Sequence, residues 1–532
     1  MKIMRIKRKG IPVIDLFAGP GGLSEGFAAY READEHAFQI LLAIEKDKYA
    51  HSTLTMRFFF HQFRPGSVPE AYYDYLRKVN EPEPERRKRL YDMFPVQART
   101  AHESVLLAEL GRDDPRTIRD RIRAALGDRE DFVLLGGPPC QPYSVMGRSR
   151  NLGNPHYDAR RDRRQRLYVE YLQVLADHHP AVFVMENVKG LLSATLENQR
   201  IFERILEDLS SPCEAILREG RTMADARRRT RYRLLSLVRY ANGDQADLRR
   251  FIIRMEKHGI PQARHRLIII GIRSDIADDS IGPLTEMAMV PLGKVLSGLP
   301  AVRSGLSKEK DDYGIWAKKV LQILSRPFMK GQEEDFDAAV KKKIRDALES
   351  IPGHNLSRGN EFIEYSAGID YRPDWFLDHR LGGVCNHTTR LHIMDDLHRY
   401  LFAACFAVVK ERSPVLRDFP PELLPKHKNA EKSARDGWFD DRFHVQLSNR
   451  PATTVTSHLA KDGHYFVHPD PLQCRSMTVR EVARIQTFPD NYVFLGPRTA
   501  QYIQVGNAVP PLLAHQIAAC VFKFLKSQGF VK

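Results

Sequence analysis

Cysteine is scarce in this sequence of 532 residues, and no two cysteines form a Cys-x-x-Cys pair. The six cysteines are spread along the whole chain: Cys140, Cys213, Cys385, Cys405, Cys474 and Cys520. Such spacing argues against a disulfide framework and against a zinc ribbon. Cys385, His387 and His392 lie close together, but their spacing matches no common set of metal ligands, so we predict no metal site.

Long hydrophobic runs are also missing. The longest uninterrupted apolar run covers residues 401–409, far short of the ~18–20 apolar residues that span a bilayer. The basic start of the chain could mimic a signal peptide, but Asp15 soon interrupts the apolar stretch that follows it. We therefore expect a soluble, cytoplasmic protein without a membrane partner.

The sequence contains no internal repeat and no low-complexity tract, and 42% of its residues are hydrophobic. This share is enough to build ordinary cores and excludes global disorder. At about 150 residues per domain, the length predicts more than one domain. The net charge is +15, which is typical of proteins that bind nucleic acid or a membrane surface, but also of proteins that are merely kept soluble by charge.

Short apolar segments alternate with sequence of helical periodicity in the first half of the chain. We predict strands at residues 11–17, 38–44, 131–135, 181–185 and 267–272. These runs are too short for helices and are apolar throughout, as expected for parallel strands with both faces covered. The pattern predicts an α/β fold with a doubly wound parallel sheet.

The alternation lapses in two places. Residues 57–130 are charged and helical in character, and we interpret them as a surface insertion in a first domain covering residues 1–280. Residues 281–472 lose the alternation and contain all three tryptophans, which indicates a second, smaller domain. Two further helices are expected in residues 473–532, at 478–487 and from about Pro511.

The first predicted strand runs into Asp-Leu-Phe-Ala-Gly-Pro-Gly-Gly at residues 15–22, ahead of a helix. Glycines at such a turn let a ligand approach the backbone, and a helix N-terminus favours an anion, so the turn suits a nucleotide-like cofactor. Glu45 ends the next strand, where an acidic residue can bind ribose hydroxyls. The alternative is a simple turn of small residues beside a surface carboxylate.

A second group of residues follows later strands. Cys140 lies in Gly-Gly-Pro-Pro-Cys-Gln-Pro-Tyr-Ser at residues 136–144, directly after a strand. Isolated cysteines are usually small buried hydrophobes, but the glycines and prolines indicate a rigid loop that presents a nucleophile. Glu186 and Asn187 end another strand at the same edge. Gln-Ala-Arg-His-Arg at residues 262–266 leads into the last strand and points alternate arginines to one face, although either group could be a surface ion-pair set.

Taken in order, these blocks resemble the DNA cytosine-5 methyltransferase family. The resemblance rests on residues 15–27, 138–144, 186–188 and 262–271, on Thr-Val-Arg-Glu-Val-Ala-Arg-Ile-Gln-Thr-Phe-Pro-Asp at 478–490, and on Gln-Tyr-Ile-Gln-Val-Gly-Asn-Ala-Val-Pro-Pro at 501–511. It implies a Rossmann-like catalytic domain, a target recognition region at 281–472, and a C-terminal segment, 501–532, that returns to the catalytic domain. It also implies S-adenosyl-L-methionine as methyl donor, with S-adenosyl-L-homocysteine as product, and a cytosine flipped out of double-stranded DNA as substrate.

The resemblance assigns roles to matching positions. Cys140 would attack carbon 6 of cytosine, Glu186 would hold the base, and Arg264 and Arg266 would contact the base oxygen or a phosphate. The cofactor would be bound by Asp15, Phe17, Ala18, Gly19, Gly21, Gly22, Leu23, Glu45, Pro138, Asn507 and Val509. DNA would be contacted by Pro139, Gln141, Ser144, Asn187, Arg163 and Arg164, the last two in an arginine-rich segment that could otherwise be a solvated helix. The family usually has an acidic residue after its third strand, which binds the adenine amine; the sequence of 57–130 gives it no evident place.

We therefore predict a monomeric bacterial methyltransferase of restriction-modification type, with a cognate endonuclease or other defence proteins acting separately. One alternative is a tRNA cytosine-5 methyltransferase, but the Cys-Phe-Thr tripeptide of that branch is missing from the sequence. The other is a catalytically inactive DNA-binding relative. The presence of Cys140, Glu186, Arg264 and Arg266 argues against it.

Overall fold

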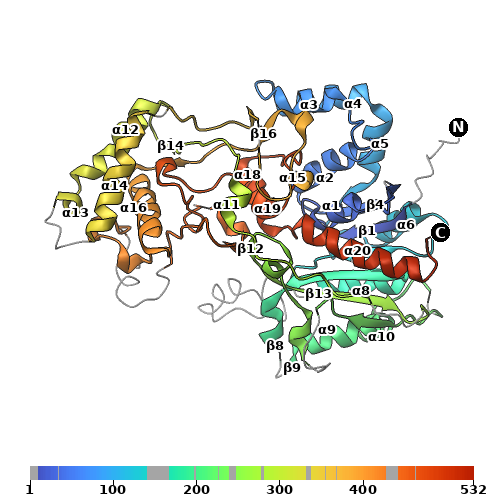
Figure 1. The fold of residues 1–532 in the computed structure, drawn as a ribbon. Coiled ribbons are helices and arrows are strands. Elements are labelled where there is room, and N and C mark those ends of the chain that lie inside the picture. Colours follow the sequence, from blue (N-terminus) through green and yellow to red (C-terminus); the bar gives the residue numbers. More distant parts are fainter. Residues whose placement is uncertain are drawn as a thin grey trace.

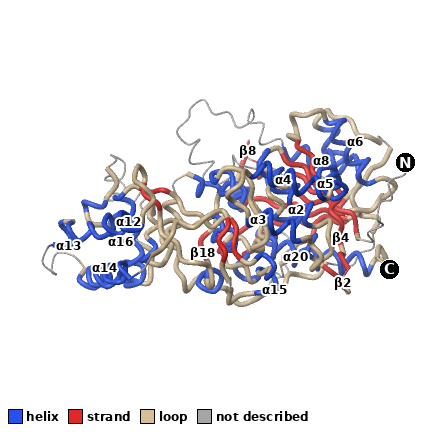
Figure 2. Tube along the Cα trace, turned by 90° about the horizontal axis from the view of Figure 1, so that it is seen from above, coloured by secondary structure: helices blue, strands red, loops and turns tan. Residues whose placement is uncertain are grey.

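The computed structural model of the chain describes residues 10–33, 35–139, 167–196, 199–225, 227–238, 247–276, 281–330, 337–353, 355–366, 368–426, 441–461 and 463–531. An α/β body and a mainly helical lobe make up this part of the chain (Figure 1). Seen from above, the lobe and the strands of the body lie toward opposite ends of an elongated molecule (Figure 2). The predicted site residues Cys140, Gln141, Ser144, Arg163 and Arg164 lie outside the described residues.

The body is built on a sheet with the strand order β10-β13-β7-β6-β1-β4-β5, and β11 also pairs with β13. Five neighbouring strands are parallel: β5 (Val105–Leu107), β4 (Phe38–Glu45), β1 (Ile11–Leu16), β6 (Val133–Gly136) and β7 (Val182–Val188). Every residue of β1 is buried, as expected for a strand covered on both faces. The prediction of an α/β fold with a doubly wound parallel sheet is confirmed for these five strands, and the whole sheet is mostly parallel.

Among the described strands of this sheet only β13 runs the opposite way, and β10 and β11 again run in the direction of the five parallel strands. β13 (His265–Arg273) is antiparallel to β7, and both β10 (Tyr232–Leu235) and β11 (Ile252–Arg254) are antiparallel to β13. The prediction of a parallel strand at residues 267–272 was wrong in direction. An apolar run carries no information about strand direction. β11 precedes β13 in the sequence and pairs with its first residues, beside the end of β7. The chain therefore enters β13 at the carboxyl edge of the sheet.

Helices cover both faces of the sheet, because alternate residues of each strand point to opposite sides. On one side Val13 packs with α1 (Gly22–Ala29) and α20 (Pro511–Ser527). On the other side Ile14 and Leu16 pack with α6 (Pro115–Leu126), α8 (Leu167–His178), α9 (Ile201–Ser210) and α10 (Pro212–Arg218). The segment Arg498–Ser527 is long and apolar enough to cross a membrane, but 72% of its most apolar window is buried within the fold.

The segment predicted as a surface insertion, residues 57–130, is more than that. It contains β5, which is a strand of the central sheet, and α6, which covers that sheet. Additional layers come from α3 (Glu70–Arg77), α4 (Glu83–Met93) and α5 (Pro95–Glu103), which pack on α2 (Lys48–Phe60). Their core is aromatic, with Phe59, Tyr72 and Tyr75 buried together.

The lobe is formed by α12 (Tyr313–Leu321), α13 (Pro327–Lys330), α14 (Ala338–Ser350) and α16 (Met394–Lys410). These helices share a core that includes Trp316, Leu348, Tyr400 and Phe402. The lobe thus has a hydrophobic cluster of its own within residues 281–472.

Part of the same region belongs to the body instead. α15 (Pro373–Phe376) and the antiparallel pair β15 (Phe362–Glu364) and β16 (Gly383–Cys385) lie beside α3 and the C-terminal elements α18 (Val479–Ile485) and α19 (Arg498–Asn507). Tyr73 Oη donates to Asp378 Oδ2 at 2.8 Å, and Trp375 Nε1 donates to Thr487 O at 2.8 Å. The remaining short elements are α11 (Leu292–Leu296), β2 (Arg31–Glu32), β3 (Glu35–His36), β8 (Thr195–Leu196), β9 (Gln199–Arg200), β12 (Gln262–Ala263), β14 (Gly305–Leu306), β17 (Leu391–His392) and β18 (Ala452–Thr453).

Candidate active site

The glycine turn between β1 and α1 is held against the end of β4. Phe17 has a φ of 56°, a left-handed conformation that is uncommon for a large side chain, and such strain concentrates at functional sites. Gly19, with a φ of 57°, donates its backbone N–H to Glu45 Oε2 at 2.8 Å. Ala18 N donates to Ile44 O at 3.1 Å. The turn and the carboxylate of Glu45 are therefore side by side.

Close packing explains two of the glycines. A Cβ atom at Gly22 would lie 2.1 Å from Val509 O, and one at Gly21 would lie 2.6 Å from Leu54 Cδ2. No side chain fits at these distances. The backbone of Val509 thus lies directly against the turn; Val509 is buried, and Asn507, two residues before it, is exposed. Leu23, also predicted at the cofactor, is buried in the core.

Asp15 lies beneath the turn as a fully buried carboxylate. Ser24 Oγ donates to Asp15 Oδ2 at 2.5 Å, whereas Oδ1 has no hydrogen-bond partner among the described residues. Burial raises the pKa of the Asp15 carboxyl to about 7, and the Ser24 hydrogen bond opposes that shift. A buried oxygen without a partner is costly unless the group stays protonated or a ligand binds it.

Two acidic residues stand at the carboxyl edge of β4 and β5. Burial raises the pKa of Glu45, although the backbone N–H groups of Asp47 and Gly19 donate to it. Glu109 follows β5 and forms an ion pair with Lys46 at 3.2 Å. Sequence reasoning missed Glu109, because three residues, Val-Leu-Leu, are too few to stand out as a strand in charged sequence.

Tyr492 and Arg57 support the turn from behind. Tyr492 Oη donates to Pro20 O, and the guanidinium of Arg57 lies 4.8 Å from the centre of the Tyr492 ring. Arg57 Nε donates to Glu25 Oε2 of α1 at 2.8 Å, with both side chains buried. Nothing in the sequence pattern pointed to this pair.

Glu186 and Arg266 form an ion pair near the end of β7. Arg266 Nε lies 3.1 Å from Glu186 Oε1, with side-chain exposures of 15% and 14%. Burial lowers the pKa of Arg266, while the charge of Glu186 opposes that shift. A Cβ atom at Gly137 would lie 3.1 Å from Glu186 Oε2, so the glycine leaves room for the carboxylate beside the loop that leads to residue 140.

Asn187 anchors that loop. Its side-chain amide donates to Pro138 O at 3.3 Å, and its own side chain is buried. Pro138 is buried and Pro139 is half-buried at the point where the described segment ends, one residue before Cys140. The structure therefore shows how the segment that leads to Cys140 is held in place. Cys140 itself lies outside the described residues.

Arg264 has different contacts from Arg266. Its guanidinium is buried and donates to Val455 O at 2.6 Å and to Ala508 O at 3.1 Å. Burial lowers its pKa well below the ordinary value, and the nearby charge of Arg266 acts in the same direction. Next to it, Gln262 Nε2 donates to Gln486 Oε1 at 2.9 Å. This part of the predicted arginine motif joins the body to its C-terminal segments.

The described residues contain no cluster of three or more potential metal ligands. The three residues considered for a metal have separate partners. His387 Nδ1 lies 2.8 Å from Thr478 Oγ1, His392 packs against the Tyr400 ring, and Cys385 is buried in the aromatic core beside α3.

The carboxyl edge of the sheet thus holds a strained glycine turn with Glu45 beside it, Glu109 after the neighbouring strand, and a partly buried carboxylate–guanidinium pair. Comparison with known proteins gives independent information about the family of this chain. Residues 113–212 and 250–523 match the sequence model of the family described as C-5 cytosine-specific DNA methylase.

Curated relatives cover most of the chain. The type II methyltransferase M.Bpa9945I of Bacillus paralicheniformis is 31% identical over 528 residues, which is 96% of this chain and 98% of the relative. The type II methyltransferase M.DdeI of Desulfomicrobium norvegicum is 24% identical over 517 residues, which is 95% of this chain and 87% of the relative. The DNA (cytosine-5-)-methyltransferase M.ApeKI of Aeropyrum pernix is 26% identical over 420 residues, covering 74% and 81%.

Proposed function

Because this chain belongs to the C-5 cytosine-specific DNA methylase family, we propose that it methylates carbon 5 of a cytosine flipped out of a specific double-stranded DNA sequence. The observation that carries the proposal is the Glu186–Arg266 pair beside Gly137 and the anchored Pro138, at the sheet edge that also holds the glycine turn. Two relatives are named type II methyltransferases, and for this chain we propose a role in protecting host DNA, in the cytoplasm and as a monomer.

The base is activated by this chain's own residues. The thiolate of Cys140 forms a bond to carbon 6 of cytosine, and the electron pair of the 5,6 double bond makes carbon 5 nucleophilic. Glu186 accepts a hydrogen bond from the exocyclic amine and, when protonated, donates one to ring nitrogen 3. Arg266 orients that carboxylate. After carbon 5 gains the methyl group it loses its proton to a base, and elimination releases the thiolate.

The donor, S-adenosyl-L-methionine, supplies an electrophilic methyl group and leaves as S-adenosyl-L-homocysteine. Two features of the turn fit such a molecule: the backbone at Gly19 is open to a ligand, with no atom within 4 Å of a Cβ there, and Glu45 can accept from ribose hydroxyls. Asn507, exposed two residues before Val509, would help to close the pocket. Glu109 is the acidic residue after the third strand of the chain's parallel half, and we assign it to the adenine amine.

Arg264 acts by positioning. Its hydrogen bonds to Val455 O and Ala508 O fix the start of β13 relative to the backbone beside Val509, which contacts the glycine turn. It would therefore keep Arg266 and the glycine turn in register without touching the base.

DNA is bound between the catalytic body and the recognition region in this proposal. Arg163 and Arg164 would contact phosphates, together with Pro139, Gln141, Ser144 and Asn187 near the flipped base. Bases would be read by the region 281–472.

The proposal is tested by expressing the chain in a host that lacks cytosine methylation and sequencing bisulfite-treated DNA. Methylation of cytosine in one recurring sequence is the expected result. Cys140→Ser should abolish it, and Cys213→Ser, at a buried cysteine of α10, is the matched control that should retain it. Methylation of tRNA with unmodified DNA, or a fully active Cys140→Ser variant, would overturn the proposal.

A further inference from the structure

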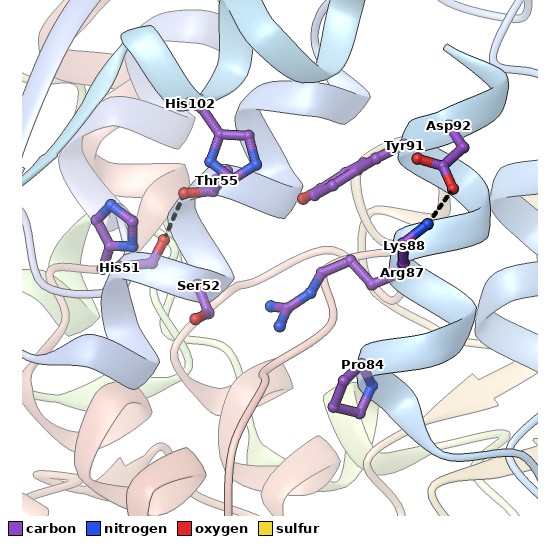
Figure 3. Close-up of a pocket in the computed structure, with 9 residues that line it drawn as sticks. All are labelled: His51, Ser52, Thr55, Pro84, Arg87, Lys88, Tyr91, Asp92 and His102. Carbon is purple, nitrogen blue, oxygen red and sulfur yellow. Dashed lines mark hydrogen bonds and ion pairs between the residues drawn. The ribbon is translucent and has the colours of Figure 1, made fainter. Parts of the chain in front are cut away.

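A cavity of about 400 Å³ lies between α2 and the added helices α4 and α5, in the segment to which no function has been assigned (Figure 3). Its lining is rich in groups that bind anions. The lining residues are His51, Ser52, Thr55, Pro84, Arg87, Lys88, Tyr91, Asp92 and His102. The cavity is formed by other residues than the glycine turn and the Glu186–Arg266 pair.

Arg87 is the cation that faces this cavity. Its Nε lies 3.5 Å from Glu83 Oε1, while its two terminal nitrogens make no hydrogen bond within the described residues. Figure 3 shows the guanidinium reaching between α4 and Ser52 of α2. The charge of the neighbouring Lys88 is compensated by Asp92, at 2.7 Å. A guanidinium with free terminal N–H groups offers a fork that matches the oxygens of a phosphate.

Tyr91 supplies a second donor. Its hydroxyl is buried and has no hydrogen-bond partner among the described residues. The ring is fixed by a tilted contact with Phe59 and an edge contact with His102, at centroid distances of 5.2 and 5.3 Å. The hydroxyl lies on the side of the ring that faces Thr55 and His102 (Figure 3). A buried hydroxyl without a partner is costly, and a ligand in the cavity would satisfy it.

Two histidines complete the wall. His51 Nε2 lies 3.3 Å from Val105 O, which leaves its other ring nitrogen for a ligand. Burial lowers the pKa of both His51 and His102, and the charge of Arg87 lowers both further. Ser52 and Thr55 donate their hydroxyl protons to backbone carbonyls of α2. The N–H of His51 is used on Val105 O, so the donors left for a ligand are Arg87, Tyr91 and the imidazole of His102.

We propose that this cavity binds the phosphate group of a small molecule of mononucleotide size. Arg87 and Tyr91 would donate to phosphate oxygens, and the imidazole of His102 would add a further donor. The volume is larger than a phosphate ion requires, and the aromatic and imidazole rings can line the remainder of a nucleotide. The proposal is independent of the methyltransferase assignment.

Calorimetry on the full chain tests the proposal, in a phosphate-free chloride buffer that contains saturating S-adenosyl-L-homocysteine to block the cofactor turn. Inorganic phosphate and adenosine monophosphate should both bind, and adenosine should not. Arg87→Gln and Tyr91→Phe should each weaken binding about tenfold or more, since each removes a donor to a charged acceptor. Arg89→Gln is the matched control, because Arg89 is 54% exposed on the same helix and pairs with Glu81.

The result also separates the two sources of phosphate. Equal affinity for phosphate and the nucleotide would mean that the site recognises the phosphate group alone. Tighter binding of the nucleotide would mean that the base and sugar also contribute to affinity. Either result supports a phosphate site. Absence of binding of both ligands to the wild-type protein, equal binding of adenosine, or wild-type affinity in both Arg87→Gln and Tyr91→Phe would overturn the proposal. Tyr91→Phe keeps the packed ring, so it remains informative if Arg87→Gln does not fold.

Discussion

Arg266 lies 3.1 Å from Glu186 because the two strands that carry them run in opposite directions. Arg266 is near the start of β13 and pairs with Val188 at the end of β7. In a parallel arrangement the start of β13 would lie at the other edge of the sheet, and the guanidinium could not reach the carboxylate. The direction of this one strand therefore creates the pair.

Removing the charge of Arg266 should slow methyl transfer. We expect Arg266→Met to lower kcat roughly 10²- to 10³-fold, because an oriented charged group beside the reacting base is lost. Single-turnover methylation of a DNA duplex measures the effect. Arg273→Met is the matched control, since Arg273 ends the same strand and pairs with Asp131 and Asp275 far from the carboxyl edge. A wild-type rate in Arg266→Met would remove Arg266 from the active site.

A methyl group at Gly22 should disrupt the junction of α1 with the C-terminal segment. The added Cβ would lie 2.1 Å from Val509 O, and such overpacking costs roughly 1–3 kcal/mol. Chemical denaturation should show this loss for Gly22→Ala, with weaker binding of S-adenosyl-L-homocysteine. Gly282→Ala, where no atom lies within 4 Å of the new Cβ, should behave like the wild type. Unchanged stability and affinity in Gly22→Ala would contradict the described packing.

Asp15 should make the folded state less stable as the pH rises. Its pKa is raised from 3.8 to about 7 by burial, so the folded state binds the proton more tightly than the unfolded state. The associated stability is complete below about pH 3.8 and is lost as the pH approaches about 7, at roughly 1.4 kcal/mol for each unit.

Asp15→Asn cannot ionise, and its amide oxygen can still accept the Ser24 hydrogen bond. The variant should therefore gain stability relative to the wild type between about pH 5 and about pH 8. Urea denaturation across this range measures the gain, with Asp128→Asn on the exposed surface as the control. A difference between Asp15→Asn and wild type that does not depend on pH would show that Asp15 is not protonated in the folded state.

Glu25 should have the opposite dependence. Burial opposes its ionisation, but Arg57 and His61 outweigh burial and hold the pKa of Glu25 well below its ordinary value of 4.5. The stability from this carboxylate is present above about pH 4.5 and is lost as the pH falls toward the folded pKa.

Glu25→Gln leaves Arg57 buried without its counter-charge, which typically costs about 3–5 kcal/mol. We expect this loss near pH 7 and a smaller one in strongly acid solution, where the wild-type carboxylate also gains a proton. Denaturation curves at the two pH values give the comparison. An equal cost at both would mean that the ion pair contributes nothing beyond packing.

Much of the fold could be predicted from short-range pattern. The predicted strands before the glycine turn, before Glu45 and before Glu186 correspond to β1, β4 and β7. The helix expected from residue 478 begins there, because Thr478 and Glu481 form a reciprocal capping box. These elements were predictable because their signals are local.

The rest depends on contacts between distant residues. β5 has only three residues and is a strand because it pairs with β4. Nothing in the sequence therefore indicated that Glu109 follows a strand. The direction of β13 follows from its pairing with β11 and β7, which leaves no trace in an apolar run. The alternation rule placed Arg264 and Arg266 on one face, and the resemblance implied one role for both. Arg264 instead donates to Val455 and Ala508, carbonyls that only the folded chain brings near.

The lobe is assembled from two separate passes of the chain, with residues 355–390 between them lying against the body. The chain leaves and rejoins the body at adjacent points, since Leu292 N donates to Arg450 O and Gly293 N to Ser448 O, both at 2.8 Å. A genetic exchange with boundaries at these points would transfer both passes at once. It would also transfer Trp375 and Asp378, whose partners Thr487 and Tyr73 stay behind in the recipient. A transferred lobe would therefore fit only where the recipient matches the donor at these contacts and at others that cross the same boundary, such as that of Asn386 with Phe494 O.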